Sequence, residues 1–332
     1  MAAGRIARTG PMEKIRKMRN RWLLVLLAMV ATLSLSAPVS ASASAGANGP
    51  LHTMGVMRVH DAHGKPGGGG SANLSYHGGT GGIGVETATA VYIVYWGSQW
   101  SSDPSGEAAI QQGFFNGVGG SSWNNSVTQY CQGVASGTIF CGTSGQRASN
   151  PSSVLKGVWS DNAAAAPSRP TQSQLAAEAT AAALHFKNTA VGSNVSTQYV
   201  VSTATGNSSS GFGTQYCAWH SSISSTYGNI AYTNFPYITD AGASCGANFV
   251  GKVTDGITIV DGHEFAETET DQFPSTGWLD ANGKENGDKC AWISSGQGAS
   301  QNITLSTGTF AVQSLWSNAF SSGAGGCVIS YP

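Results

Sequence analysis

The stretch Val91-Tyr-Ile-Val-Tyr-Trp96 is a continuous apolar run of strand-forming residues, which is typical of a buried β-strand. Residues 198–204 show a second strand pattern. Apolar residues at helical spacing mark residues 106–118 and the Ala-rich segment 171–187 as helices. Because helices and strands alternate along the chain, we expect an α/β or α+β fold with a mixed sheet. The high Gly and Ser content keeps an all-β fold open as the alternative.

The first 45 residues have the layout of a secretion signal. A basic start is followed by an apolar run at 22–35 and by small residues that end near Ala45. The apolar run is shorter than the ~20 residues that span a bilayer, so a signal peptide is preferred over a membrane anchor. We therefore expect residues 1–45 to be removed and the protein to be secreted, either extracellular or associated with a cell wall.

Two regions follow the predicted signal. Residues 46–84 are rich in Gly, Ser and His and are predicted to form a flexible leader. Residues 85–332 are long enough for a single domain with one sizeable core. Without the first 45 residues, the chain holds 9 basic and 16 acidic residues. This acidity argues against partners such as nucleic acid or an anionic membrane.

All six cysteines lie after the predicted signal. An even number in an exported chain predicts three disulfide bonds. No closely spaced pair such as CxxC is present, which disfavours a zinc site built from cysteines. Pairing in sequential order closes the shortest loops and is our preferred connectivity: Cys131 with Cys141, Cys217 with Cys245, and Cys290 with Cys327.

Acidic residues are concentrated in one segment. Nine of them lie between Asp255 and Asp288, and the lysines nearby are only Lys252, Lys284 and Lys289. So much negative charge in a short segment repels itself unless something positive offsets it, and a bound cation is the simplest solution.

The acidic segment contains Gly262-His-Glu-Phe-Ala-Glu267. On a helix, His263 and Glu267 lie one turn apart on the same face, where both reach one ion. Glu264 then lies where a general base for water belongs. The pattern is that of HExxH zinc peptidases with the second histidine replaced by glutamate, so it predicts a zincin-like domain. Glu285 is the expected third zinc ligand, and Asp288 either orients His263 or exchanges roles with Glu285.

Alternatives to this metal site stay open. Calcium is the rival ion because oxygen ligands are abundant, but the imidazole of His263 favours Zn²⁺. His220 is an alternative ligand, although a histidine beside a cysteine is commonly a core residue. An acidic helix face exposed to solvent would also explain HExxE without any metal. No GxSxG motif points to a serine hydrolase.

Several blocks of the chain resemble the Exordium / phosphate-induced protein 1 family of plant extracellular proteins. Residues 254–267 are similar to its DG…HE-[ILV]-AE signature, and 285–290 to its E-x-[GA]-D-x-C. Asp271 and Gln272 depart from the Asn-Pro that is usual in the plant proteins. The resemblance implies an extracellular or cell-wall location and a link to growth, and it favours the second and third disulfide pairings. It implies no settled reaction. Further similar blocks are 91–100, 199–203, 217–220 and 313–318.

Two functions compete on these grounds. The first is a secreted zinc metallohydrolase, peptidase-like, that acts on an extracellular peptide, protein or cell-wall substrate. The second is a non-catalytic growth or signalling protein with a structural cation. Glu264 favours the enzyme, because a structural site has no use for an unliganded carboxylate beside the metal. A glutamate ligand favours the second, because its charge weakens the metal as a Lewis acid.

Overall fold

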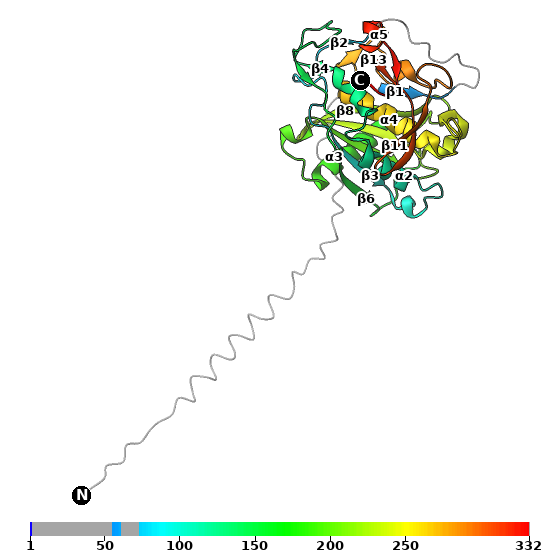
Figure 1. Ribbon diagram of the computed structural model, residues 1–332. Coiled ribbons are helices and arrows are strands. Elements are labelled where there is room, and N and C mark those ends of the chain that lie inside the picture. The colour runs from blue at the N-terminus through cyan, green and yellow to red at the C-terminus, as the bar shows by residue number, and fades with distance from the viewer. Residues whose placement is uncertain (2–54, 61–72, 332) are drawn as a thin grey trace. The chain divides into compact units, whose positions relative to one another are not determined.

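A six-stranded mixed sheet forms the centre of the computed structural model, which describes residues 1, 55–60 and 73–331 (Figure 1). In the strand order given below, the third to sixth strands run parallel to one another, whereas the second strand pairs antiparallel with both the first and the third. The mixed sheet agrees with an α/β or α+β fold, and the all-β alternative is wrong. The order is β1 (Gly55–Arg58), β8 (Tyr216–Ser225), β9 (Gly228–Phe235), β7 (Thr197–Thr203), β3 (Ala90–Trp96) and β6 (Leu155–Asp161).

Helices cover both faces of this sheet. Helix α3 (Gln172–His185) begins at a capping box in which Thr171 and Gln174 satisfy each other's backbone N–H groups. It packs its alanines and Leu175 on one face. Helices α2 (Glu107–Val118) and α4 (Asp255–Thr270) pack on the opposite face, which holds the larger apolar core.

Short elements complete the chain. Four two-stranded sheets are β2 (Ser75–Tyr76) with β10 (Trp278–Leu279), β4 (Cys131–Gln132) with β5 (Gln146–Arg147), β11 (Gln301–Leu305) with β12 (Gly308–Val312), and β13 (Leu315–Ser317) with β14 (Gly326–Val328). The remaining helical segments are η1 (Ser98–Ser101), η2 (Asn124–Gln129), η3 (Val191–Asn194), η4 (Ile238–Cys245), η5 (Asp288–Cys290) and α5 (Phe320–Gly323).

Three disulfide bonds join the cysteines in the predicted sequential order. Cys217–Cys245 ties β8 to η4, and Cys290–Cys327 ties η5 to β14. Cys131–Cys141 closes a loop near β4. No cysteine is free, and all six lie within the described ranges. The disulfides agree with an oxidising compartment.

Strand β1 differs from the expectation of a flexible leader over residues 46–84. It forms the edge of the main sheet, and Met57 is completely buried. Residues 75–76 also form a strand, β2. The physical reason is that Met57 and its neighbours bury apolar surface against β8, which Gly- and Ser-rich composition alone does not reveal. Residues 46–54 and 61–72 of that predicted leader lie outside the described residues.

Contacts divide the chain at Ser42 into two units. The first includes most of the predicted signal peptide and, apart from Met1, lies outside the described residues, so that signal stays a prediction. Within the described ranges, no helix has both the length and the apolar character needed to cross a membrane.

Two buried carboxyl groups of the domain predict an unusual dependence of stability on pH. Burial raises the pKa of Glu86 to about 8, although a hydrogen bond from Gln198 acts to lower this pKa. Burial, together with the nearby Asp161, raises the pKa of Glu178 to about 8. The folded protein therefore keeps both protons up to about pH 8, whereas the unfolded chain loses them near its ordinary pKa of 4.5. Folded protein binds more protons in this window, so raising the pH destabilises it.

We expect the free energy of unfolding, measured with denaturant in the presence of chelator, to fall between pH 5 and pH 8. Each group contributes a slope of about 1.4 kcal/mol per pH unit while only the folded state holds its proton. Glu178→Gln, which is neutral at every pH, should unfold at a higher denaturant concentration than the parent at pH 8 and at a similar one at pH 5. Equal stability of the parent at both pH values would contradict this expectation.

Candidate metal centre

Helix α4 is the structural basis of the site, and all of its 16 residues are buried. A buried helix with five acidic residues must satisfy each carboxylate individually. Asp255 accepts backbone N–H bonds from residues 250–252 at 2.6–2.8 Å. Asp261 accepts from the amide of Gln111, and Glu269 from Thr89 and Asn124. The two acids left over, Glu264 and Glu267, belong to the candidate site.

Two further acids of the predicted cluster also have hydrogen-bond partners nearby in the sequence. Asp271 accepts bonds from Ser275 and Thr276 in the turn after α4. Asp280 accepts from two backbone N–H groups and pairs with Lys289 at 3.2 Å. Of the nine acids between 255 and 288, therefore, only Glu264, Glu267, Glu285 and Asp288 remain to meet a cation.

His263 and Glu267 face each other across one turn of α4, as the spacing predicted. His263 Nε2 lies 3.0 Å from Glu267 Oε1 and 4.0 Å from Asp288 Oδ1. The backbone N–H of Asp288 also donates to Glu267 Oε1 at 2.8 Å. One potential ligand atom from each of these three residues therefore lies within 4.8 Å of the others.

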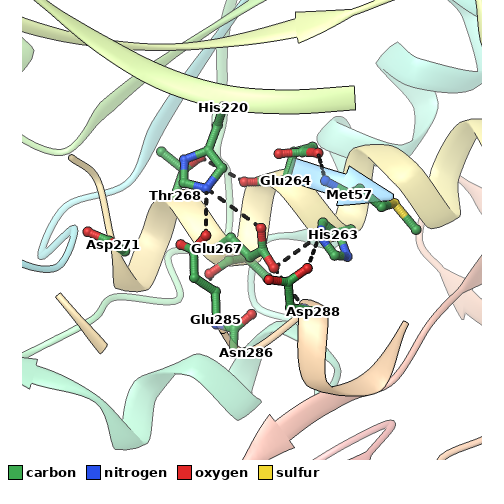
Figure 2. A network of polar contacts seen from close by, with 12 residues as sticks. Met57, His220, His263, Glu264, Glu267, Thr268, Asp271, Glu285, Asn286 and Asp288 are labelled. Carbon is green, nitrogen blue, oxygen red and sulfur yellow. Dashed lines mark hydrogen bonds and ion pairs between the residues drawn. The ribbon is translucent and has the colours of Figure 1, made fainter. Parts of the chain in front are cut away.

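His220 reaches the same carboxylate from β8. Its Nε2 atom lies 3.6 Å from Glu267 Oε2 and 3.2 Å from Glu285 Oε2. Figure 2 shows Glu267 between the two histidines, with one carboxylate oxygen toward each ring. His220, Glu264 and Glu267 form a second group whose ligand atoms lie within 4.8 Å of one another. Strand alternation explains this placement, because Trp219 packs toward α3 and its neighbour must face α4.

The loop that carries Glu285 and Asp288 is held on α4 by Asn286. Its side-chain amide donates to Ala266 O at 2.9 Å and to Thr270 Oγ1 at 2.8 Å. Gly287 follows, and a side chain there would press against Glu267 and His263. This anchoring directs Asp288 to His263 and Glu285 to His220, one on each side of Glu267.

Gln313, just after β12, orients His263. Its amide nitrogen donates to Gly287 O at 2.8 Å, which leaves Oε1 as the acceptor 3.1 Å from His263 Nδ1. The imidazole therefore donates from Nδ1 and directs Nε2 at Glu267 and Asp288. Metal-bound histidines commonly have such an outer hydrogen-bond partner. Sequence reasoning assigned that role to Asp288, and no local signal distinguishes Gln313.

Strand β1 closes the site from the other side. The backbone N–H of Met57 donates to Glu264 Oε1 at 3.3 Å. Gly55 lies directly opposite His220 in the sheet, and a Cβ on Gly55 would overlap His220 Nε2. Glycine is therefore required there by the close approach of the backbone to the ring.

The pKa values of these histidines and carboxylates are shifted in different directions. Burial would raise the pKa of Glu267, but the charge of His263 and a hydrogen bond with His220 outweigh it and lower the pKa to about 2. Burial lowers the pKa of His263, yet Glu267 and Glu264 raise it to about 10, and Glu285 raises that of His220 well above 6.5. Burial raises the pKa of Glu264 to about 8. Protons thus provide the positive charge that a metal ion would otherwise supply.

Several polar atoms of the site have no hydrogen-bond partner in the described part of the chain. All belong to buried side chains, where an unsatisfied polar atom costs roughly 1–3 kcal/mol. Every ion pair that the site carboxylates form among described residues is with a histidine. The atoms without any partner are His220 Nδ1, Glu264 Oε2 and Glu285 Oε1, while His263 Nε2 and Glu267 Oε2 have only the ion-pair contacts described above.

No family model, no curated protein and no solved structure matches this chain. The resemblance to the Exordium / phosphate-induced protein 1 group therefore stays a prediction.

The structure brings together all six residues that the sequence proposed for the site. His263, Glu264 and Glu267 lie on α4, His220 on β8, and Glu285 and Asp288 in the loop that leads into η5. The order of the last two differs from the preferred assignment, because Asp288 rather than Glu285 joins His263 and Glu267. Residues missed by sequence reasoning are Gly55, Met57, Asn286 and Gln313.

Proposed function

We propose that this protein is a secreted metal-dependent hydrolase of the peptidase type, with a zinc ion held by His263, Glu267 and Asp288. The observation that supports it most is the convergence of two buried histidines on the one buried carboxylate of Glu267. Unsatisfied atoms surround that point, and no Lys or Arg of the described residues pairs with these carboxylates. A cation in their midst would satisfy the unpaired atoms and balance the charge.

Zinc suits this donor set better than calcium. Calcium takes six to eight oxygen ligands and avoids imidazole, whereas catalytic zinc takes three protein ligands of mixed N and O type. His263 offers Nε2, and Glu267 and Asp288 offer one oxygen each. Asp288 is also where the site meets solvent, because its side chain is 26% exposed while those of His263 and Glu267 are completely buried.

Glu264 is the residue that supports hydrolysis rather than a purely structural ion. Zinc, when bound, supplies a Lewis acid that polarises a carbonyl oxygen and makes water more acidic. Glu264 follows a ligand directly on α4, and its Oε2 atom has no partner among described residues. It can accept the proton of an attacking water and pass it to the leaving amine. Asp288 and Glu267 would hold the ion together with His263, and Gln313 orients the imidazole of His263.

Metal analysis of the purified protein tests the site. We expect about one equivalent of zinc per chain, removable by chelator and restored by added zinc, with a higher melting temperature in the loaded protein. His263→Ala should weaken zinc binding more than the roughly 10–100-fold that loss of an outer partner costs. His185→Ala is the matched control, because this exposed histidine stacks on Trp159, away from the site.

A second function is favoured by one observation. The candidate centre is almost completely enclosed, with exposed fractions of 0–3% for His220, His263, Glu264, Glu267 and Glu285. That enclosure suits a structural cation in a non-catalytic extracellular or cell-wall protein. Zinc binding with no hydrolysis of any peptide mixture, by the parent or by variants with an opened site, would decide for this alternative. Full metal retention in His263→Ala would instead place the ion elsewhere.

A further inference from the structure

Strand β1 lies against the candidate centre in the way an extended peptide would. It pairs antiparallel with β8, with Gly55 opposite His220 and Met57 opposite Ala218. It also contacts α4, so it lies between β8 and the helix that carries HEFAE, and we call the place that it occupies the β1 groove. Figure 2 shows its backbone beside Glu264, to which Met57 donates its N–H.

The side chains of β1 alternate as a bound peptide's would. Gly55 and Met57 face the site and are buried, whereas Val56 is half-buried and Arg58 is exposed on the other side. The position beside His220 has room only for glycine. Two residues on, the groove takes a long apolar side chain. Main-chain hydrogen bonds with alternate side-chain pockets are the mode of recognition by strand addition.

The end of β1 and the residues just beyond it are also held by hydrogen bonds. Trp292 Nε1 donates to Arg58 O at 2.8 Å, and the backbone N–H of His60 donates to Ser244 O at 2.8 Å. The His60 ring meets Phe249 and Trp292 edge-on, with ring centroids 5.3 and 5.6 Å away. Along residues 55–60, a position with room only for glycine is therefore followed by a buried apolar side chain at Met57 and by aromatic contacts at His60.

We propose that this groove is a peptide-binding cleft, that it takes extended peptides with a glycine beside His220, and that β1 occupies it in competition with them. The binding of peptide follows from the groove alone, whereas its cleavage rests on the proposed hydrolase function. With β1 in place the candidate centre is enclosed, and Glu264 is bonded to a backbone N–H instead of being open to water. Displacement of β1 would open the cleft and expose His220.

Gly55→Leu is the variant that tests this competition. Its side chain overlaps His220 and should expel β1, while the three disulfides hold the rest of the domain. We expect diethyl pyrocarbonate to modify His220 at least about tenfold faster than in the parent, because a locally opened state becomes the dominant one. Arg58→Ala is the control, since this exposed side chain leaves the β1 backbone pairing intact.

Peptides added in trans test the cleft itself. The labelled peptide Gly-Val-Met-Arg-Val-His should bind Gly55→Leu, and it should bind the parent at least about tenfold more weakly, because β1 competes at high effective concentration. The same peptide with leucine in place of glycine should not bind either protein. Hydrolysis of a glycine-containing peptide mixture should rise about tenfold or more in Gly55→Leu over the parent and Arg58→Ala.

The outcomes separate the two proposals. Exposure of His220 and peptide binding without hydrolysis would support the cleft and contradict the hydrolase. A folded Gly55→Leu that keeps His220 protected and binds no peptide would overturn the cleft. If Gly55→Leu does not fold, hydrogen exchange of the parent decides. Amides of β1 should then exchange at least about 100-fold faster than those of the β8–β9 ladder, by local opening. Equal rates would make β1 a permanent strand and overturn the proposal.

Discussion

Glu264→Gln is expected to lower the hydrolytic rate by roughly 10²–10⁴-fold, the contribution of a positioned general base. Zinc content and melting temperature should stay close to those of the parent. Amide and carboxylate are similar in size, and the amide oxygen can still accept the 3.3 Å bond from Met57. Hydrolysis is best measured in the Gly55→Leu background as well as in the parent, since β1 borders this carboxylate.

Glu269→Gln is the matched control for that measurement. Both glutamates are buried on α4, but the carboxylate of Glu269 bonds to Thr89 and Asn124 and takes no part in the site. It should leave hydrolysis unchanged. Should Glu264→Gln lose zinc or melt at a markedly lower temperature, Glu264 is a ligand beside His220 or a structural partner, and its role as a base is wrong.

Glu267→Gln is expected to have the largest effect on the metal. Both groups of ligand atoms found among the described residues contain this carboxylate, so its loss removes a ligand from either arrangement. Zinc affinity should fall by more than the roughly 10–100-fold typical of an outer-partner loss. The metal-free protein should also lose on the order of 3–5 kcal/mol of stability at neutral pH, because two buried, protonated histidines lose their shared counter-charge.

The control for Glu267→Gln is Asp280→Asn. Asp280 is also buried and ion-paired, with Lys289, but it lies outside the two ligand groups. This change should lower stability in denaturant titrations while zinc binding measured by calorimetry stays intact. Zinc retained at full affinity by Glu267→Gln would contradict the centre as described.

The elements predicted best are those whose signal is local. Strands β3 and β7 and helices α2 and α3 agree with the predicted segments to within about two residues, because burial imposes its periodicity directly on the sequence. Strand β1 was missed because its signal is not local. Four residues in a Gly-rich region carry too little pattern, and their strand conformation depends on β8, which lies some 160 residues later in the chain.

The residues of the candidate site also differ in whether a local sequence signal predicts them. The pair His263 and Glu267 follows from helix geometry alone. Which of Glu285 and Asp288 approaches which histidine depends on Asn286, whose side-chain hydrogen bonds hold the loop on α4. The sequence of this loop has no periodicity from which that placement could be predicted. Gln313 lies 50 residues from the ring it orients, so nothing near either residue reveals the contact. Acid density alone overstated the site, since five of the nine acids accept hydrogen bonds from donors outside it. Asp255, Asp271 and Asp280 have partners nearby in the sequence, whereas the partners of Asp261 and Glu269 lie far away in the chain.

Two of the disulfides have a consequence for when the centre can acquire its ion. Cys217 lies three residues before His220, and Cys290 lies two residues after Asp288, so one cross-link fixes each side of the donor set. In a reducing cytosol these bonds do not form, and the ligands are not held at their final spacing. If the chain is secreted and binds a metal as proposed, we therefore expect it to leave its site of synthesis without the ion. The metal would then be chosen by what the surroundings outside the cell supply, and not by the competition among ions at the ribosome.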